Sequence, residues 1–348
     1  MSLGPRFFSG SLAPLGSVIM SVSPANICQV SFVGLGITII SLTMLPKAVQ
    51  KHVLDYGPRK IKRSSSDDNG KGEEEPEPAP SAFEQALAAV VAHLQVPHSW
   101  FISFYVFYLL CSAYWAAQWW SWRQAGPGSE VPNNLFGLIV TRQQTSDLVL
   151  ASLPATSMVL AQVYIAFTLE AVQTGRRMYE YLCVFKPSKA KMNAEHFLMG
   201  FIYYAIMSVA VWVEGSQAIM TAKQHNTKFV PESAFAKIVV GTFFFLLAWV
   251  GQYRCHAHLA SLKKYSLPEE GLFRYLISPH YTCELSMYVA LSIVTAPEGR
   301  LVNRTVFSSL LFVLANLGVT ADRTKRWYSE KFGAERVAKK WRIIPFVF

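Results

Sequence analysis

Charged side chains are scarce in this sequence. They make up 16% of the 348 residues, whereas a soluble protein averages about 25%. Hydrophobic residues reach 52% and aromatic residues 14%. The surface of a soluble domain of this length needs more charge than the chain carries, so a soluble globular fold is excluded. The same composition excludes a wholly disordered chain.

Cysteine is also sparse, and its spacing carries little information. The chain has five cysteines, an odd number, and none of them forms a Cys-x-x-Cys pair. Neither a disulfide framework nor a zinc ribbon is therefore predicted. The N-terminus lacks a basic segment followed by an apolar run and a small-residue cleavage site, so we expect no removed signal peptide.

What the sequence does contain is a series of long apolar segments. A helix needs about 20 mostly apolar residues to cross a bilayer. Seven segments qualify, the last two being shorter and more polar: 28–46, 99–120, 147–172, 195–214, 235–253, 281–297 and 305–320. A backbone in lipid must satisfy its own hydrogen bonds, which favours helices. We predict an all-α integral membrane protein with a bundle of about seven transmembrane helices.

Lysine and arginine concentrate in alternate loops. The segments 47–98, 174–193, 254–279 and 321–348 hold 24 of the 32 basic residues. Basic loops stay on the cytosolic side of a membrane, so we expect a cytosolic C-terminus and a lumenal N-terminus. This topology, with attraction to anionic lipid, accounts for the net charge of +10 without a nucleic acid partner.

One segment differs in kind from the apolar regions. Residues 64–81 read SSSDDNGKGEEEPEPAPS and contain no large apolar side chain. Such a segment buries too little surface to offset the entropy of ordering, so we predict a disordered cytosolic loop. It separates an N-terminal region with the first membrane helix, 1–63, from a membrane domain at 96–348.

Polar residues cluster in the C-terminal third. Glu284 lies inside an apolar helix, where a carboxylate is costly and marks a functional site or an internal partner. Nearby lysines can neutralise phosphate, and a helix start can bind it through free N–H groups. His256 and His258 alone make a weak metal site, so no metal is predicted. A polyanionic ligand is expected here.

Several ordered motifs in this region resemble those of the steroid 5α-reductase family, within it the polyprenal reductase branch. One motif comprises Pro268, Gly271, Phe273, Tyr275, Ser278, His280, Tyr281 and Glu284, and the chain ends in Ile344-Pro345-Phe346-Val347-Phe348. Two further stretches are similar to the polyprenal branch: Leu169-Glu170-x-x-Gln173-x-x-Arg176-Arg177 and Gln252-Tyr253-Arg254-Cys255-His256. The resemblance covers about 96–348 in pieces.

The resemblance implies an activity and a cofactor. The activity is the NADPH-dependent reduction of the α-isoprene double bond of polyprenal to dolichal. The reaction serves dolichol biosynthesis for protein N-glycosylation in the endoplasmic reticulum membrane. The cofactor site would lie in 235–348, and the residues that match its positions are Gln252, His256, Lys263, Tyr265, His280, Glu284, Tyr328 and Lys340.

The chemistry limits the substrate and the catalytic groups. Hydride adds to an alkene when a conjugated carbonyl takes up the negative charge, so the substrate is the aldehyde rather than the alcohol. The enzyme must polarise the carbonyl oxygen and supply a proton. Steroid-acting relatives use a Glu in an early helix for this work. The segment 99–120 has no Asp or Glu, which argues against a steroid substrate.

The catalytic candidates lie on one helical face. Glu170, Gln173 and Arg177 follow one another at three- and four-residue spacing and therefore stack on the same side of a helix. We assign Glu170 and Gln173 to the polarisation or protonation of the substrate. An internal Glu–Arg pair that holds the bundle together is the alternative role. Tyr105 and Tyr108 are alternative proton donors, or aromatic packing residues.

Other functions remain open from the sequence. The same family includes reductases of 3-oxo-5α-steroids and of other enals and enones. An integral-membrane S-adenosylmethionine-dependent methyltransferase shares a helix-rich body, and a transporter would show repeats and polar residues spread over several helices. The sequon Asn303-Arg304-Thr305 lies in a short turn next to an apolar segment, so we expect it to carry no glycan.

Overall fold

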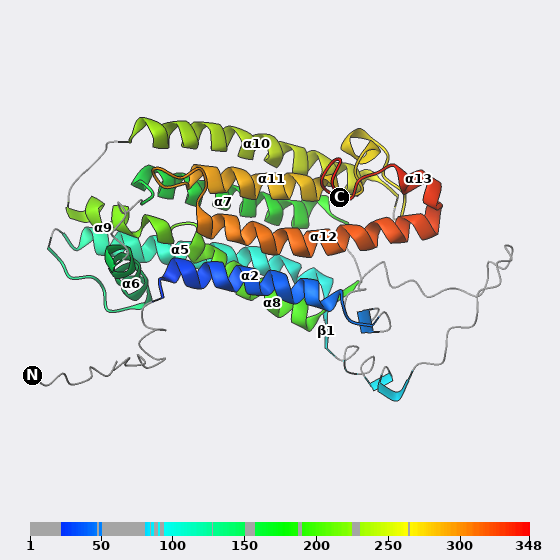
Figure 1. Cartoon of the computed structure of the whole chain (residues 1–348), viewed down its shortest axis with the longest axis horizontal. Helices are drawn as coiled ribbons and strands as arrows, with labels where there is room; N and C mark the ends of the chain where they lie inside the picture. The colour runs from blue at the N-terminus through cyan, green and yellow to red at the C-terminus, as the bar shows by residue number, and fades with distance from the viewer. Residues whose placement is uncertain are drawn as a thin grey trace, which may run out of the picture.

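The protein is a bundle of long helices. The computed structural model describes residues 22–46, 94–126, 128–149, 157–186, 190–224, 230–263 and 265–348, with a few more between 49 and 90. Its main helices are α2 (Pro24–Leu42), α5 (Ile102–Gln124), α6 (Leu135–Val149), α7 (Leu160–Tyr179), α8 (Ala194–Ala210), α9 (Ser216–Gln224), α10 (Glu232–Ser261), α11 (Pro279–Val294), α12 (Arg304–Phe332) and α13 (Ala334–Ala338) (Figure 1). The predicted loop at 64–81 lies outside the described residues, apart from Ser81.

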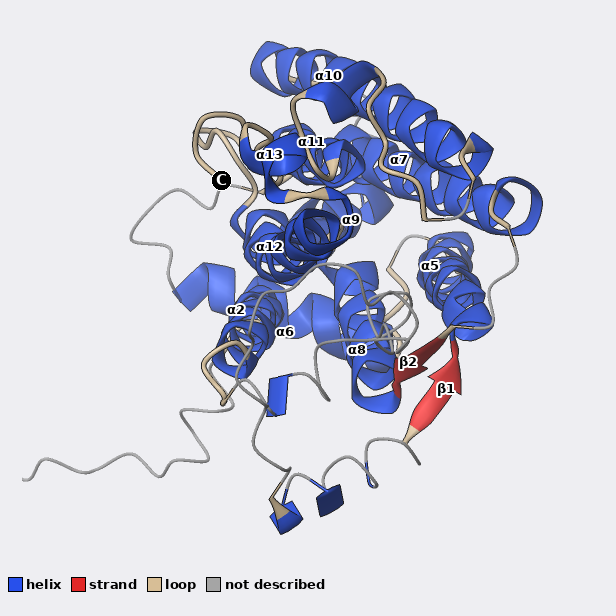
Figure 2. Cartoon of the chain, turned by 90° about the vertical axis from the view of Figure 1, so that its right-hand side faces the viewer, coloured by secondary structure: helices blue, strands red, loops and turns tan. Residues whose placement is uncertain are grey.

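The expectation of an all-α membrane protein is confirmed. Five helical stretches in the described part of the chain are long and apolar enough to cross a membrane: 24–42, 98–124, 194–223, 232–261 and 304–332. α7 and α11, which are shorter or more polar, pack in the same bundle (Figure 2). The last predicted segment was too short, because α12 continues for 29 residues into a polar end.

The predicted segment 147–172 is shifted in the structure. α6 ends at Val149, and α7 begins only at Leu160. The reason is Gln162, whose side chain accepts a hydrogen bond from the Val159 N–H at 2.9 Å and so caps α7. The same amide donates at 2.8 Å to the carbonyl of Val294 at the end of α11. Gln162 lowers the hydropathy of this segment, yet its side chain fixes the residue at which α7 starts.

Close helix packing sets the shape of the bundle. α10 and α11 approach each other at Gly241, where a Cβ atom would lie 2.5 Å from a Val294 methyl group and 2.9 Å from the Ala290 carbonyl oxygen. Small residues at helix contacts allow such an approach in membranes, where packing rather than the hydrophobic effect drives association. The pair α10–α11 lies on one side of α12, and α2 and α8 lie on the other (Figure 2).

The described parts of three segments rich in basic residues, 174–193, 254–279 and 321–348, gather at one end of the bundle (Figure 1). There, β1 (Gln95–Pro97) pairs antiparallel with β2 (Lys191–Asn193). The Tyr181 hydroxyl donates to the His98 carbonyl at 3.0 Å, and Ile277 N–H donates to the Trp341 carbonyl at 2.8 Å. This arrangement agrees with the expected topology, while the side of the membrane on which this end lies stays a prediction.

We predict that the sequon at Asn303 carries no glycan. Asn303 is fully buried, and its Oδ1 accepts the Val306 N–H at 2.9 Å at the start of α12. Its Nδ2 donates to the Thr295 carbonyl at 3.2 Å, so the amide that a glycosyltransferase must reach is occupied. Protein expressed in a eukaryotic cell and treated with endoglycosidase should show no change in mobility. A mobility shift that Asn303→Gln abolishes would contradict the buried position.

Candidate active site

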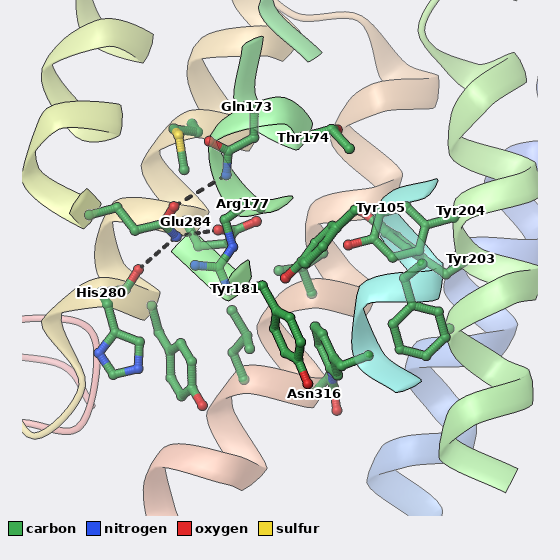
Figure 3. A pocket seen from close by; sticks show the side chains of 18 of the residues that line it. Tyr105, Gln173, Thr174, Arg177, Tyr181, Tyr203, Tyr204, His280, Glu284 and Asn316 are labelled. Atoms are coloured by element: carbon green, nitrogen blue, oxygen red, sulfur yellow. Dashed lines mark hydrogen bonds between the residues drawn. The ribbon is translucent and has the colours of Figure 1, made fainter. Parts of the chain in front are cut away.

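A cavity of about 470 Å³ runs between the two sides of the bundle near its basic end. α7, α10 and α11 form one wall, α5 and α8 form the opposite wall, and α12 contributes Phe312 and Asn316. Figure 3 shows Gln173, Arg177, Glu284 and His280 on one side and Tyr105, Tyr203 and Tyr204 on the other. Polar and apolar side chains are thus segregated within a single cavity.

Three helices meet in a layer of hydrogen-bonded polar side chains. Gln252 of α10 lies at its centre and is 2% exposed. Its amide nitrogen donates to the Glu284 carboxylate of α11 and, at 3.3 Å, to the His280 carbonyl. Its amide oxygen accepts from Gln173 of α7 at 3.2 Å and from Arg176. The bonds fix the orientation of this amide and present a carboxylate to the cavity.

A second group of charges surrounds Glu180, whose side chain is fully buried. A π-helical turn at Glu180–Val184 follows α7 and turns this carboxylate inward, as such turns often do at functional sites. Arg177 donates to one carboxylate oxygen, which also lies 2.8 Å from His256 Nδ1. Arg176 Nε lies 3.6 Å from the other oxygen. Each buried charge therefore has a partner of opposite sign.

The inner part of the cavity is lined by apolar and aromatic side chains. Phe245, Met287, Phe312 and Val313 are among the residues that line it. Gly200 leaves room for the Phe104 ring, since a Cβ atom there would lie 2.6 Å from it. Such a surface suits a hydrocarbon chain and offers few groups that bind water.

The structure brings together the three residues predicted as catalytic. Glu170, Gln173 and Tyr105 all line the cavity. The Tyr108 hydroxyl of α5 is buried and has no hydrogen-bond partner among the described residues. The Arg177 guanidinium lies over the Tyr105 ring, 5.7 Å from its centroid. The alternative role of an internal Glu–Arg pair is filled by Glu180 rather than by Glu170.

The residues predicted to bind the cofactor fall into two groups. Gln252, His256, His280 and Glu284 line the cavity, whereas Lys263, Tyr265, Tyr328 and Lys340 do not. Lys263 and Tyr265 follow the end of α10, Tyr328 lies in the last turns of α12, and Lys340 follows α13. Sequence reasoning quoted Arg176 within a motif but assigned it no role. It did not single out Tyr203 or Tyr288, because tyrosines in apolar runs carry no motif.

The loop group is rich in cations held by backbone carbonyls. Lys340 Nζ donates to the Pro268 carbonyl at 3.2 Å, and Lys325 Nζ donates to the Lys340 carbonyl at 2.6 Å. Burial lowers the pKa of Lys340 from its ordinary value. The Lys331 ammonium lies 4.8 Å from the centroid of the Tyr265 ring. Tyr328 packs in a small apolar cluster, and this packing supports the loops at the basic end.

We predict that Glu180 is needed for folding. Glu180→Ala leaves Arg176 and Arg177 buried without their counter-charge, which we expect to cost about 3–5 kcal/mol of folding free energy. The melting temperature, taken from the fraction of protein that stays monodisperse after heating, measures the loss of stability. The exposed Glu335→Gln is the control. Equal melting temperatures for the two variants would contradict the assigned role.

The sequence of this chain is similar to those of several known proteins. Residues 217–348 match the family described as 3-oxo-5-alpha-steroid 4-dehydrogenase. A protein of Drosophila melanogaster named polyprenal reductase is 28% identical over 76% of this chain and 81% of its own length. A Saccharomyces cerevisiae protein of the same name is 32% identical, over 49% of this chain and 60% of its own length.

A plant protein extends the comparison. Polyprenal reductase 2 of Oryza sativa subsp. japonica is 29% identical over 52% of this chain and 58% of its own length. The chain therefore spans about three fifths of the yeast and rice relatives. The resemblance predicted from the sequence motifs is confirmed, and residues 217–348 are the part of this chain that matches the model of the 3-oxo-5-alpha-steroid 4-dehydrogenase family.

Proposed function

We propose that this protein is an NADPH-dependent reductase of the α-isoprene double bond of polyprenal, which it converts to dolichal. The observation that carries the proposal is one membrane-embedded cavity with a polar layer toward the loops and an apolar interior. The relatives in fly, yeast and rice are named polyprenal reductases. The product would feed dolichol synthesis and hence protein N-glycosylation in the endoplasmic reticulum membrane.

The apolar interior supports a prenyl substrate. An isoprenoid aldehyde has one polar end and a long hydrocarbon tail, and it dissolves in the bilayer rather than in water. The inner walls provide Phe245, Met287 and Phe312 for the hydrocarbon. Apolar pockets with few convergent polar groups are typical of such ligands. The aldehyde would therefore lie toward the polar layer and the tail toward the lipid.

The polar groups fit a dinucleotide that reaches in from the basic end. His280 Nδ1 is buried at the cavity, and among the described residues it has no hydrogen-bond partner, so a ligand can supply one. Glu284, oriented by Gln252, can accept a hydrogen bond from an amide, while Lys263 and Lys340 suit phosphate. When bound, NADPH would supply the hydride. A methyltransferase cofactor would gain nothing from these phosphate-binding lysines.

Three side chains stand where the carbonyl of the substrate must be polarised. Glu170 lies one helical turn deeper on α7 than Gln173, which Arg176 holds in place with a 2.7 Å hydrogen bond. A protonated Glu170 can donate a hydrogen bond to the aldehyde oxygen and so stabilise the negative charge that develops there. Tyr105, beside Arg177, closes the wall opposite. These three form the catalytic set of the proposal.

The proposal also includes the orientation of the protein in the membrane. A cytosolic basic end would let the cofactor enter from the cytosol, where the 24 basic residues of the alternate loops predict the C-terminus to lie. The substrate would enter sideways from the membrane. Residues 96–348 would form the reductase domain, and 235–348 its cofactor-binding part.

The substrate assay tests the function directly. We expect the purified protein with NADPH to reduce polyprenal at least tenfold faster than it reduces a 3-oxo-4-ene steroid, and to leave polyprenol unreduced. Mass spectrometry of the lipid products measures both rates. Faster reduction of the steroid would contradict the polyprenal substrate, and binding of S-adenosylmethionine without NADPH binding would contradict the reductase.

A conservative variant tests Glu170. Glu170→Gln keeps the shape of the side chain but removes the acidic proton, so we expect turnover of polyprenal to fall by about 100-fold, in the range of general acid catalysis. NADPH binding, measured by quenching of tryptophan fluorescence, should stay unchanged. The exposed Glu335→Gln is the matched control. Unchanged turnover in Glu170→Gln would remove Glu170 from the catalytic set.

A further inference from the structure

Two tyrosines join hydroxyl groups across the cavity. The Tyr203 hydroxyl of α8 donates to the Tyr288 hydroxyl of α11 with 2.5 Å between the oxygens. Both residues line the cavity, and together they connect the wall that carries Glu284 with the wall opposite. No motif of the sequence points to either residue. The two hydroxyl groups are therefore polar groups inside the apolar half of the cavity, and their presence there needs an explanation.

The position of Tyr288 relative to the polar layer is fixed by α11. Tyr288 follows Glu284 by four residues, so the two side chains stack on one face of the helix about one turn, or 5.4 Å, apart. Glu170 lies at a similar depth on α7, one turn beyond Gln173. Glu170, Tyr203 and Tyr288 all line the same cavity.

Tyr203 is held rigidly on three sides. Its ring packs against Phe312 of α12 with 4.9 Å between centroids, against Phe32 of α2 at 5.7 Å and against Tyr204 at 5.4 Å. Its side chain is 5% exposed. Because packing rather than ligand binding sets its position, Tyr203 can orient the Tyr288 hydroxyl before any substrate arrives. Pre-orientation of this kind is what a catalytic donor requires.

Reduction of an enal needs two separate donors. One must polarise the carbonyl oxygen while hydride adds to the β-carbon, and another must deliver a proton to the α-carbon to complete the saturated aldehyde. These positions are two bonds apart, so one rigid group serves both poorly. The set of Glu170, Gln173 and Tyr105 provides for the oxygen, since Glu170 carries the acidic proton. Nothing in that set is assigned to the α-carbon.

We propose that Tyr288 is the catalytic residue that protonates the α-carbon of the substrate, and that Tyr203 is a positioning residue that supports it. This inference rests on the proposed reduction of an enal. Hydride from the reduced nicotinamide forms the new C–H bond at the β-carbon, and the π electrons move to give an enolate. The Tyr288 O–H bond then breaks, its proton forms the C–H bond at the α-carbon, and the hydrogen bond from Tyr203 stabilises the phenolate until water returns a proton.

The experiment compares three tyrosine-to-phenylalanine variants by steady-state kinetics with NADPH and a range of polyprenal concentrations. Tyr288→Phe should lower the rate about 100-fold or more, and Tyr203→Phe about tenfold in kcat with KM unchanged. Tyr114→Phe, which loses the same hydroxyl on an exposed side chain outside the cavity, should match the wild type. NADPH binding should be equal in all four proteins, which separates a lost proton donor from a distorted site.

The possible outcomes separate the proposed function from the role inferred for Tyr288. A wild-type protein that reduces no enal overturns the proposed function and this inference with it. An active wild type in which Tyr288→Phe reduces polyprenal as fast as Tyr114→Phe overturns the inference alone. If Tyr288→Phe fails to bind NADPH, Tyr203→Phe decides instead. A loss of kcat at constant KM supports the pair, and a rise in KM at constant kcat assigns the tyrosines to packing.

Discussion

The burial of charge in a membrane bundle is the constraint on which this structure depends. A carboxylate or guanidinium without a partner is too costly to leave in lipid, so each charged side chain in the middle of the chain must meet another. Glu180 meets Arg176, Arg177 and His256 at the junction of α7 and α10. The resulting contacts join the end of α7 to α10 beside the cavity.

Around that ionic group, polar and apolar functions are divided along the cavity. Gln252 links α7, α10 and α11 at the level of Glu284, where a polar cofactor end can bind. One turn deeper, Glu170, Tyr203 and Tyr288 face a surface of aromatic and aliphatic side chains. Hydride and proton must reach adjacent carbons, so a cavity that changes character within one helical turn suits the reduction of a conjugated double bond.

Much of the fold could be predicted from apolar runs, because lipid demands helices of a minimum length. The limits of α7 could not, since the Gln162 amide that caps the helix at Val159 is also bonded to Val294, 132 positions away. The face of Glu170, Gln173 and Arg177 followed from helical spacing alone. The Tyr203–Tyr288 bond could not be predicted, because spacing within one helix does not reveal which residue of another helix lies opposite.

The transfer of deuterium tests the central claim most directly. Polyprenal is incubated with the protein and with NADPH that carries deuterium at the transferable position. Mass spectrometry and NMR then determine which carbon of the product carries the deuterium. The account predicts a single deuterium on the β-carbon of a saturated aldehyde. Deuterium on the carbonyl carbon, with the double bond intact, would show that the cavity presents the other end of the conjugated system to the hydride and would contradict the account.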